Sequence, residues 1–202
     1  MPMSPEEFYA HALAAADGEK RLPVSRLMPY WDIFPFEPDR LQVVPLREPE
    51  LPEKERFDED PATCKTCAKR DEGVWLDDHW RLDVLEGTGV PLLLMLYPRD
   101  HYDFPDLPDD RAAELGRLSV RIGRAVEALP HVSRTHVYRI GDGGAHLHVF
   151  FFARPAGFHQ LRGSGLVLWD DLLPLYPSER ARADGFVVAE ALAAEYGGQV
   201  NR

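Results

Sequence analysis

The stretch Gly141–Pro155, GDGGAHLHVFFFARP, carries two histidines one residue apart in an apolar run. Side chains alternate between the two faces of a β-strand, so this pattern predicts His146, His148 and Phe150 on one face. Histidine is an uncommon choice for two adjacent same-face positions of a core strand. A buried imidazole bonded to the backbone, with a neighbour beside it, is one interpretation. A functional site is the other, and the pattern alone leaves both open.

A hairpin is predicted between the strand that contains His136 and the strand that contains His146, with Asp142-Gly143 as a tight turn. A two-residue turn there would pair Arg139 with His146, and cross-strand partners share a face. Arg139 therefore becomes a candidate substrate-binding residue beside the imidazoles, and His136 is expected on the opposite face. One inserted residue would reverse this assignment.

The only two cysteines of the 202 residues form a Cys-Lys-Thr-Cys motif in a polar loop. The apolar stretch 90–98, expected to be a buried strand, is followed directly by His101. Cys64, Cys67, His101 and His146 would together make a Cys2His2 zinc site. The alternatives are an exposed reduced cysteine pair beside a structural His101, or a redox-active pair.

The chain as a whole predicts an α+β fold with an antiparallel sheet. The expected elements are a helix over 5–16, a proline-rich arm over 22–62, strands over 74–85 and 90–98, a long amphipathic helix over 108–129, the hairpin, and a last helix over 178–196. The arm segment MPYWDIFPF, 28–36, is too aromatic for a free linker, so we expect it to cover the sheet or a dimer seam. The charged stretch 48–60 is expected to be mobile.

Composition limits the possible partners. The formal net charge is −11 and the pI is near 5.1, which argues against a broad nucleic-acid or anionic-membrane surface. A small phosphate ligand stays compatible with this charge, because one arginine, a metal or a helix N-terminus supplies local positive potential. No apolar run is long enough to span a membrane, and the first residues are unlike a secretory signal. We therefore expect a cytoplasmic protein that binds neither nucleic acid nor membrane.

The stretch HLHVFFFAR is similar to the histidine-triad (HIT) signature, in which His-φ-His-φ-His-φ-φ is followed closely by Pro-Arg. His146 and His148 stand at the first two histidines, Phe150 at the third, and Ala153-Arg154 at the Pro-Arg. Four further segments match the family in order: TCKTC its zinc knuckle, VWLDDHWRL its first strand, LLLMLYPRDHYDFPDL its Pro-x-x-His segment and DDRAAELGRL the start of its long helix. The resemblance implies a HIT-like domain over 61–156, between an N-terminal helix and arm over 1–60 and a C-terminal extension with a helix over 157–202.

The resemblance also implies a five-stranded antiparallel sheet with a packed helix, usually in a homodimer. The implied activity is nucleotidyl hydrolysis or transfer on a nucleoside phosphate ester, anhydride or phosphoramidate. The catalytic nucleophile would be His148, which would form a nucleotidyl-imidazole intermediate. In zinc-bearing members, including the galactose-1-phosphate uridylyltransferase branch, the metal ligands correspond to Cys64, Cys67, His101 and His146. The zinc site expected from the residues and the ligand set of the family thus coincide.

Phe150 departs from the family pattern. The third histidine helps to hold the phosphate and the leaving group, and the uridylyltransferase branch has glutamine there, whereas phenylalanine donates no hydrogen bond. Arg139 or Arg154 would be a substitute donor, although Arg154 would equally suit a surface position. A non-catalytic HIT-like protein that binds a nucleotide or a protein partner, with structural zinc, is therefore the alternative function.

Overall fold

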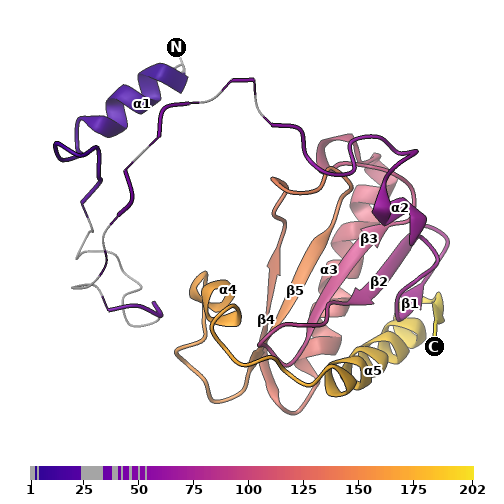
Figure 1. The fold of residues 1–202 in the computed structure, drawn as a ribbon. Coiled ribbons are helices and arrows are strands. Elements are labelled where there is room, and N and C mark those ends of the chain that lie inside the picture. Colours follow the sequence, from indigo (N-terminus) through magenta and orange to yellow (C-terminus); the bar gives the residue numbers. More distant parts are fainter. Residues whose placement is uncertain are drawn as a thin grey trace. The chain divides into compact units, whose positions relative to one another are not determined.

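The computed structural model describes residues 3, 5–23, 34–37, 41, 43–45, 47–49, 51–52 and 54–202 (Figure 1). The chain forms two compact units, Met1–Glu55 and Arg56–Arg202. The first unit contains helix α1 (Pro5–Leu13), close to the predicted bounds. Most of the aromatic arm segment 28–36 lies outside the described residues. Its predicted role, to cover the sheet or a dimer seam, therefore stays a prediction.

The second unit is built on a six-stranded antiparallel sheet, which confirms the predicted fold class. The strands, in the order β4-β5-β3-β2-β1-β6, are β4 (Val132–Tyr138), β5 (Val149–Pro155), β3 (Leu93–Pro98), β2 (Trp80–Val84), β1 (Trp75–Leu76) and β6 (Gln199–Val200). The C-terminal extension supplies β6, which pairs with β1. One strand more is therefore present than the five that the resemblance implies.

The segment predicted as one strand over 74–85 is instead the hairpin β1–β2. The carboxylate of Asp77 accepts hydrogen bonds from the backbone N–H groups of His79 at 2.8 Å and of Trp80 at 2.6 Å. An aspartate that bonds the backbone two and three residues ahead is typical of a tight turn. This polar turn interrupts the apolar run and folds the segment back on itself.

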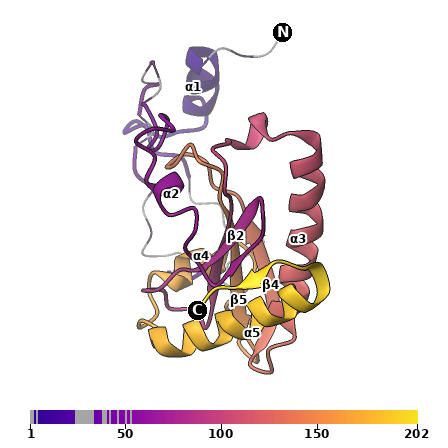
Figure 2. The ribbon, with the colours of Figure 1, turned by 90° about the vertical axis from the view of Figure 1, so that its right-hand side faces the viewer.

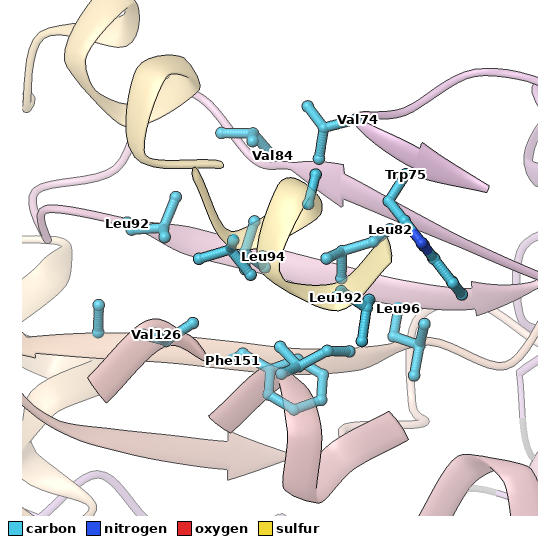
Figure 3. Packing of buried hydrophobic residues seen from close by; sticks show 14 of the residues in the cluster. Val74, Trp75, Leu82, Val84, Leu92, Leu94, Leu96, Val126, Phe151 and Leu192 are labelled. Carbon is cyan, nitrogen blue, oxygen red and sulfur yellow. The ribbon is translucent and has the colours of Figure 1, made fainter. Parts of the chain in front are cut away.

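Two long helices cover one face of the sheet, α3 (Asp109–Glu127) and α5 (Ser178–Tyr196) (Figure 2). Figure 3 shows Val126 of α3 and Leu192 of α5 pointing into the same cluster as Leu94 and Phe151 of the strands. Each fully buried side chain of this kind contributes about 1.5–3 kcal/mol. The predicted inward face of α3 is correct over its last three turns, but Ala113 in its first turns is exposed, contrary to expectation.

The other face of the sheet carries a second, smaller cluster. The short helix α4 (Gly165–Asp170) covers part of this face and buries Leu166 against Phe152. Its last residue, Asp170, accepts hydrogen bonds from the backbone N–H groups of Gly89 and Val90 at 2.8 and 2.9 Å. We call the rest of this side, which extends towards His148 and which no other element of Arg56–Arg202 covers, the open face. No helix among the described residues has the length and apolar character of a membrane span.

The β4–β5 pairing corrects the predicted hairpin. Tyr138 pairs with Phe150 and His136 with Phe152, so the register is shifted by three residues from the expected pairing of Arg139 with His146. A shift by an odd number reverses the faces, and His136 therefore shares the face of Phe150 rather than the opposite one. The connection between the strands is a loop over 139–148 and not a two-residue turn.

Candidate metal centre and active site

Both histidines of the motif precede β5 instead of lying within it, although the predicted alternation is kept. Leu147 between them is buried in the main core, and its N–H donates to the Tyr102 carbonyl at 2.7 Å. Because Leu147 points into the core, His146 and His148 project to the other side. One backbone contact thus fixes the direction of both imidazoles.

The four predicted metal ligands come together in space. Their ligand atoms all lie within 4.8 Å of one another. The Nδ1 atom of His146 is 3.5 Å from Sγ of Cys64 and 3.4 Å from Sγ of Cys67, which is itself 3.4 Å from Nδ1 of His101. Around a tetrahedral zinc, bonds of about 2.3 Å to sulfur and 2.0–2.1 Å to nitrogen place S and N about 3.6 Å apart. The cluster therefore fits a tetrahedral metal ion with little rearrangement.

Hydrogen bonding sets the protonation of His146. Its Nε2 lies 2.9 Å from the carbonyl oxygen of Pro98, which only accepts, so Nε2 carries the proton and Nδ1 presents its lone pair to the thiols. Burial lowers the pKa of His146, and the Pro98 carbonyl opposes this effect. The neutral form that results is the one that binds a metal.

The cysteine motif begins the one-turn helix α2 (Lys65–Ala68), where the Cys67 N–H donates to Sγ of Cys64 at 3.3 Å. Asp58 holds this turn from outside. Its carboxylate accepts from the Lys65 N–H at 2.9 Å and from the Thr66 hydroxyl at 3.1 Å. Partial burial opposes ionisation of Asp58, but these hydrogen bonds outweigh it and lower its pKa.

The pKa of the Cys67 thiol is unlike that of a catalytic redox cysteine. Burial, reinforced by the adjacent Cys64, raises the pKa of the Cys67 thiol to about 11. Catalytic redox cysteines have lowered pKa values, because the thiolate is the nucleophile. A bound cation would reverse this preference by replacing the thiol proton. The raised pKa thus argues against the redox alternative, and the convergence of the four ligand atoms favours a metal site.

Residues just before the cysteine motif connect the four candidate metal ligands, which we call the metal end, to the loop that precedes His146. The sequence does not predict this connection. The Phe57 N–H donates to the Gly143 carbonyl at 2.8 Å, and the Ala145 N–H donates to the Phe57 carbonyl at 2.8 Å. This pairing takes up the glycine loop, which is why no two-residue turn forms there. Part of the stretch 48–60 that we expected to be mobile is therefore fixed. A lone aromatic residue inside a charged run was the available signal.

Arg139 is engaged outside the imidazole surface. Its guanidinium donates to Asp103 at 2.8 Å, and Arg56 donates to the other oxygen of the same carboxylate at 2.7 Å. Partial burial opposes ionisation of Asp103, but the Phe104 N–H and the two arginines outweigh it and lower its pKa. The predicted position of Arg139 beside His146 is thus wrong, because it depended on the wrong register.

Arg154 is buried, not a surface residue. It donates to the Ser133 hydroxyl at 2.7 Å and to the Phe158 carbonyl at 3.1 Å. These contacts tie the end of β5 to β4 and to the start of the C-terminal extension. Both arginines considered as substitutes for a third histidine are therefore bonded to protein groups.

His148 has the opposite arrangement to His146. Its Nδ1 lies 2.9 Å from the backbone carbonyl of His146, so in the neutral ring the proton is on Nδ1 and Nε2 keeps its lone pair. The side chain is half-buried, with the Phe150 ring edge-on at 5.2 Å and the Tyr97 ring at 6.5 Å between centroids. A neutral imidazole with one oriented nitrogen lone pair is suited to nucleophilic attack.

Comparison with known proteins adds to this geometry. No protein-family model matches the chain, and no curated protein does. Among solved structures, a HIT-like protein from Bartonella henselae aligns at 15% identity with a TM-score of 0.50, over 68% of this chain and 100% of that one. A histidine triad protein from Marinobacter aquaeolei aligns at 15% identity with a TM-score of 0.50, over 69% and 98%. The fold is HIT-like.

A zinc-bound histidine triad family protein from Mycobacterium smegmatis also aligns, at 20% identity with a TM-score of 0.49, over 67% of this chain and 96% of that one. The two alignments with a TM-score of 0.50 establish the HIT-like fold, and the site is judged on its own residues. The Cys2His2 cluster forms a candidate metal site, and His148 lies beside it with no hydrogen bond to its Nε2 from the described residues.

Proposed function

We propose that the protein is a HIT-like nucleotidyl hydrolase or transferase in which His148 is the catalytic nucleophile. The observation that carries the proposal is the hydrogen bond from Nδ1 of His148 to the His146 carbonyl, which leaves Nε2 as the free base. The substrate would be a nucleoside phosphate ester, anhydride or phosphoramidate, as the HIT-like fold suggests.

The proposed chemistry has two displacements at one phosphorus atom. Nε2 of His148 attacks the α-phosphorus, the P–Nε2 bond forms, and the bond to the leaving group breaks with its electron pair. The leaving group takes a proton from water. Water or another acceptor hydroxyl then attacks, the P–Nε2 bond breaks and returns its pair to the imidazole, and a proton is released to solvent. The bond to the His146 carbonyl stabilises the charge on the ring through both steps.

Zinc is proposed as the ion at the four-residue cluster. The two thiols and two imidazoles match the preference of zinc for sulfur and nitrogen ligands in a closed tetrahedral site. Its role would be structural: it would join α2, the end of β3 and the segment that carries the nucleophile. The ligand set is the one that the resemblance assigns to zinc-bearing members such as the uridylyltransferase branch. A reduced cysteine pair also agrees with our expectation of a cytoplasmic protein.

The test is trapping of the covalent intermediate. Wild-type protein mixed with an adenosine 5′-phosphoramidate should release adenosine monophosphate and, quenched in base, carry one nucleotidyl group on His148 by peptide mass spectrometry. His148→Ala should lose both signals, with a fall in rate on the order of 1,000-fold or more. Turnover that survives His148→Ala would overturn the mechanism.

A non-catalytic nucleotide-binding or partner-binding protein is the second candidate, and Phe150 is the observation that favours it. No hydrogen bond can be donated from this ring to a transition-state oxygen, and one lost donor costs on the order of 100-fold in rate. Nucleotide binding with no release of monophosphate from any phosphoramidate, ester or anhydride would support this candidate.

We also propose that the chain forms a homodimer through α3 and β4. β4 is an edge strand, and a groove of about 520 Å³ lies between it and α3, lined in part by Val120, Arg124, Glu127 and Val137. A two-fold axis here would bring Arg124 of one copy towards Glu127 of the other. Val120→Asp should halve the mass measured in solution, whereas Val187→Asp, on an exposed position of α5, should leave it unchanged. A wild-type monomer would refute this assembly.

A further inference from the structure

The surface next to His148 is a row of apolar side chains. Along the strand, His148 is followed on the same side by Phe150 and then Phe152, whose ring centroids are 6.0 Å apart. Across the sheet, Phe150 pairs with Met95 of β3 and with Tyr138 of β4. Cross-strand partners share a face, so Met95, Phe150 and Tyr138 form one continuous row. This row is the floor of the open face beside the nucleophile.

The hydroxyl groups near this floor are bonded to the protein. Tyr138 donates to the Gly163 carbonyl at 3.0 Å, in the C-terminal extension. Tyr97, whose ring lies near His148, directs its hydroxyl to the Met95 sulfur at 3.0 Å. Neither proton is available to a ligand without the loss of an existing contact. Both tyrosines therefore present ring surface rather than a donor.

The two arginines nearest to the motif in the sequence are bonded elsewhere too. Arg139 pairs with Asp103, and Arg154 bonds Ser133 and the Phe158 carbonyl. On β2, Asp83 pairs with Met95, so the row ends on that side at a carboxylate that is ion-paired with the buried Arg81 guanidinium at 3.3 Å. A polyphosphate chain on this floor would lose water without gaining a donor from Arg139, Arg154 or the two tyrosines, which is costly.

An apolar wall stands at the far end of the floor. Phe150 packs against the cluster that α4 completes, together with Val167 and Trp169. Asp170 holds α4 in place through its two bonds to the β2–β3 connection. The extension thus closes the side of the floor opposite the metal end with more apolar surface.

We propose that the group expelled from phosphorus by His148 is uncharged and apolar, an aromatic or aliphatic amine or alcohol, and that Phe150 selects it. This inference rests on the proposed function and narrows it from esters, anhydrides and phosphoramidates to phosphoramidates and esters of apolar groups. Phe150, Met95 and Tyr138 bury the apolar group, and the free energy of that burial replaces the missing hydrogen bond. Phe150 is then a specificity residue of the active site.

The experiment uses two adenosine 5′-phosphoramidates whose amines have similar basicity, one made with 2-phenylethylamine and one with O-phosphoethanolamine. Wild-type kcat/KM should favour the phenylethyl compound by about 100-fold, because a charged group without partners is penalised on this floor. Phe150→Gln, which supplies a donor, should reduce this ratio below about 10-fold. Phe150→Leu, apolar and without a donor, should keep most of it.

Equal kcat/KM values for the two compounds in wild-type protein, or a preference for the charged one, would overturn the inference. Turnover of neither compound would instead count against the proposed function. The selectivity is then decided by affinity: calorimetric titration of His148→Ala with both compounds should give a lower Kd for the phenylethyl compound, and equal Kd values would overturn the inference without reference to catalysis.

Discussion

His146 and His148 are chemically identical side chains two residues apart, and the structure gives them opposite arrangements. His146 donates its Nε2 proton to the Pro98 carbonyl and turns Nδ1 towards the two cysteines. His148 donates its Nδ1 proton to the His146 carbonyl and leaves Nε2 free. One imidazole is nearly fully buried and the other half-buried. In each ring, one backbone carbonyl accepts the proton of one nitrogen and so decides that the other nitrogen keeps its lone pair.

In the proposed function, this difference suits the two histidines of one short motif to two tasks. A metal ligand needs a neutral ring within about 2.1 Å of the ion, whereas a nucleophile needs a lone pair that faces substrate. The backbone carbonyl of His146 links the two, because it accepts the proton that orients His148. A metal ion held by the four-residue cluster would thus help to orient the proposed nucleophile, His148, through the backbone.

The largest expected effect comes from removing the side chain of His146. His146→Ala takes away one metal ligand but keeps the backbone carbonyl that orients His148. We expect zinc content, measured by inductively coupled plasma mass spectrometry, to fall from one per chain to a small fraction. The melting temperature should fall by roughly 10 °C, since a structural metal contributes folding free energy.

The matched control is His148→Ala, which removes the other ring of the pair. It should keep one zinc per chain and change the melting temperature by no more than about 2 °C, because it deletes a half-buried side chain with one neutral hydrogen bond. Loss of zinc from His148→Ala, or retention of zinc by His146→Ala, would mean that the assignment of the two histidines is wrong.

The same motif shows what the sequence predicts well and what it does not. The alternation of Leu147, Val149 and Phe151 into the core is a local property of the chain, and the sequence predicts it correctly. Residue type and order also predict the four candidate metal ligands, which the fold brings within 4.8 Å of one another. The predicted register of β4 against β5 is wrong, because the loop between these strands pairs with Phe57, more than 80 positions earlier in the chain. Backbone pairing between such distant segments produces no periodic pattern of apolar residues in the sequence.

The roles of single polar side chains were harder still to predict. The positions of Arg139 and Arg154 in the chain suggest phosphate donors. In the structure, Arg139 donates to Asp103 and Arg154 donates to Ser133. Asp58, which holds the cysteine turn, belongs to a stretch whose charge suggested mobility. Charge in a sequence shows that a side chain needs a partner, and only the fold decides which one.

A smaller effect is expected where both imidazoles contact a common neighbour. The ring centroid of Tyr97 lies 6.4 Å from that of His146 and 6.5 Å from that of His148, and the buried Arg81 guanidinium stacks on the ring at 4.0 Å. Tyr97→Leu removes this support. Because a misplacement of about 1 Å costs up to 100-fold in rate, we expect kcat to fall about 10-fold with little change in KM.

Tyr97→Phe is the control that separates the ring from its hydroxyl. Burial, against the opposing effect of Arg81, raises the pKa of Tyr97 to about 12, so the hydroxyl stays protonated and cannot act as a base near neutral pH. Tyr97→Phe should therefore keep kcat within about two-fold, with an unchanged pH–rate profile between pH 6 and about 9. Zinc analysis of Tyr97→Leu completes the test. If zinc content and kcat fall together, the Tyr97 ring supports the metal ligand His146. If kcat falls alone, the ring holds His148 in the position from which its Nε2 lone pair faces the substrate.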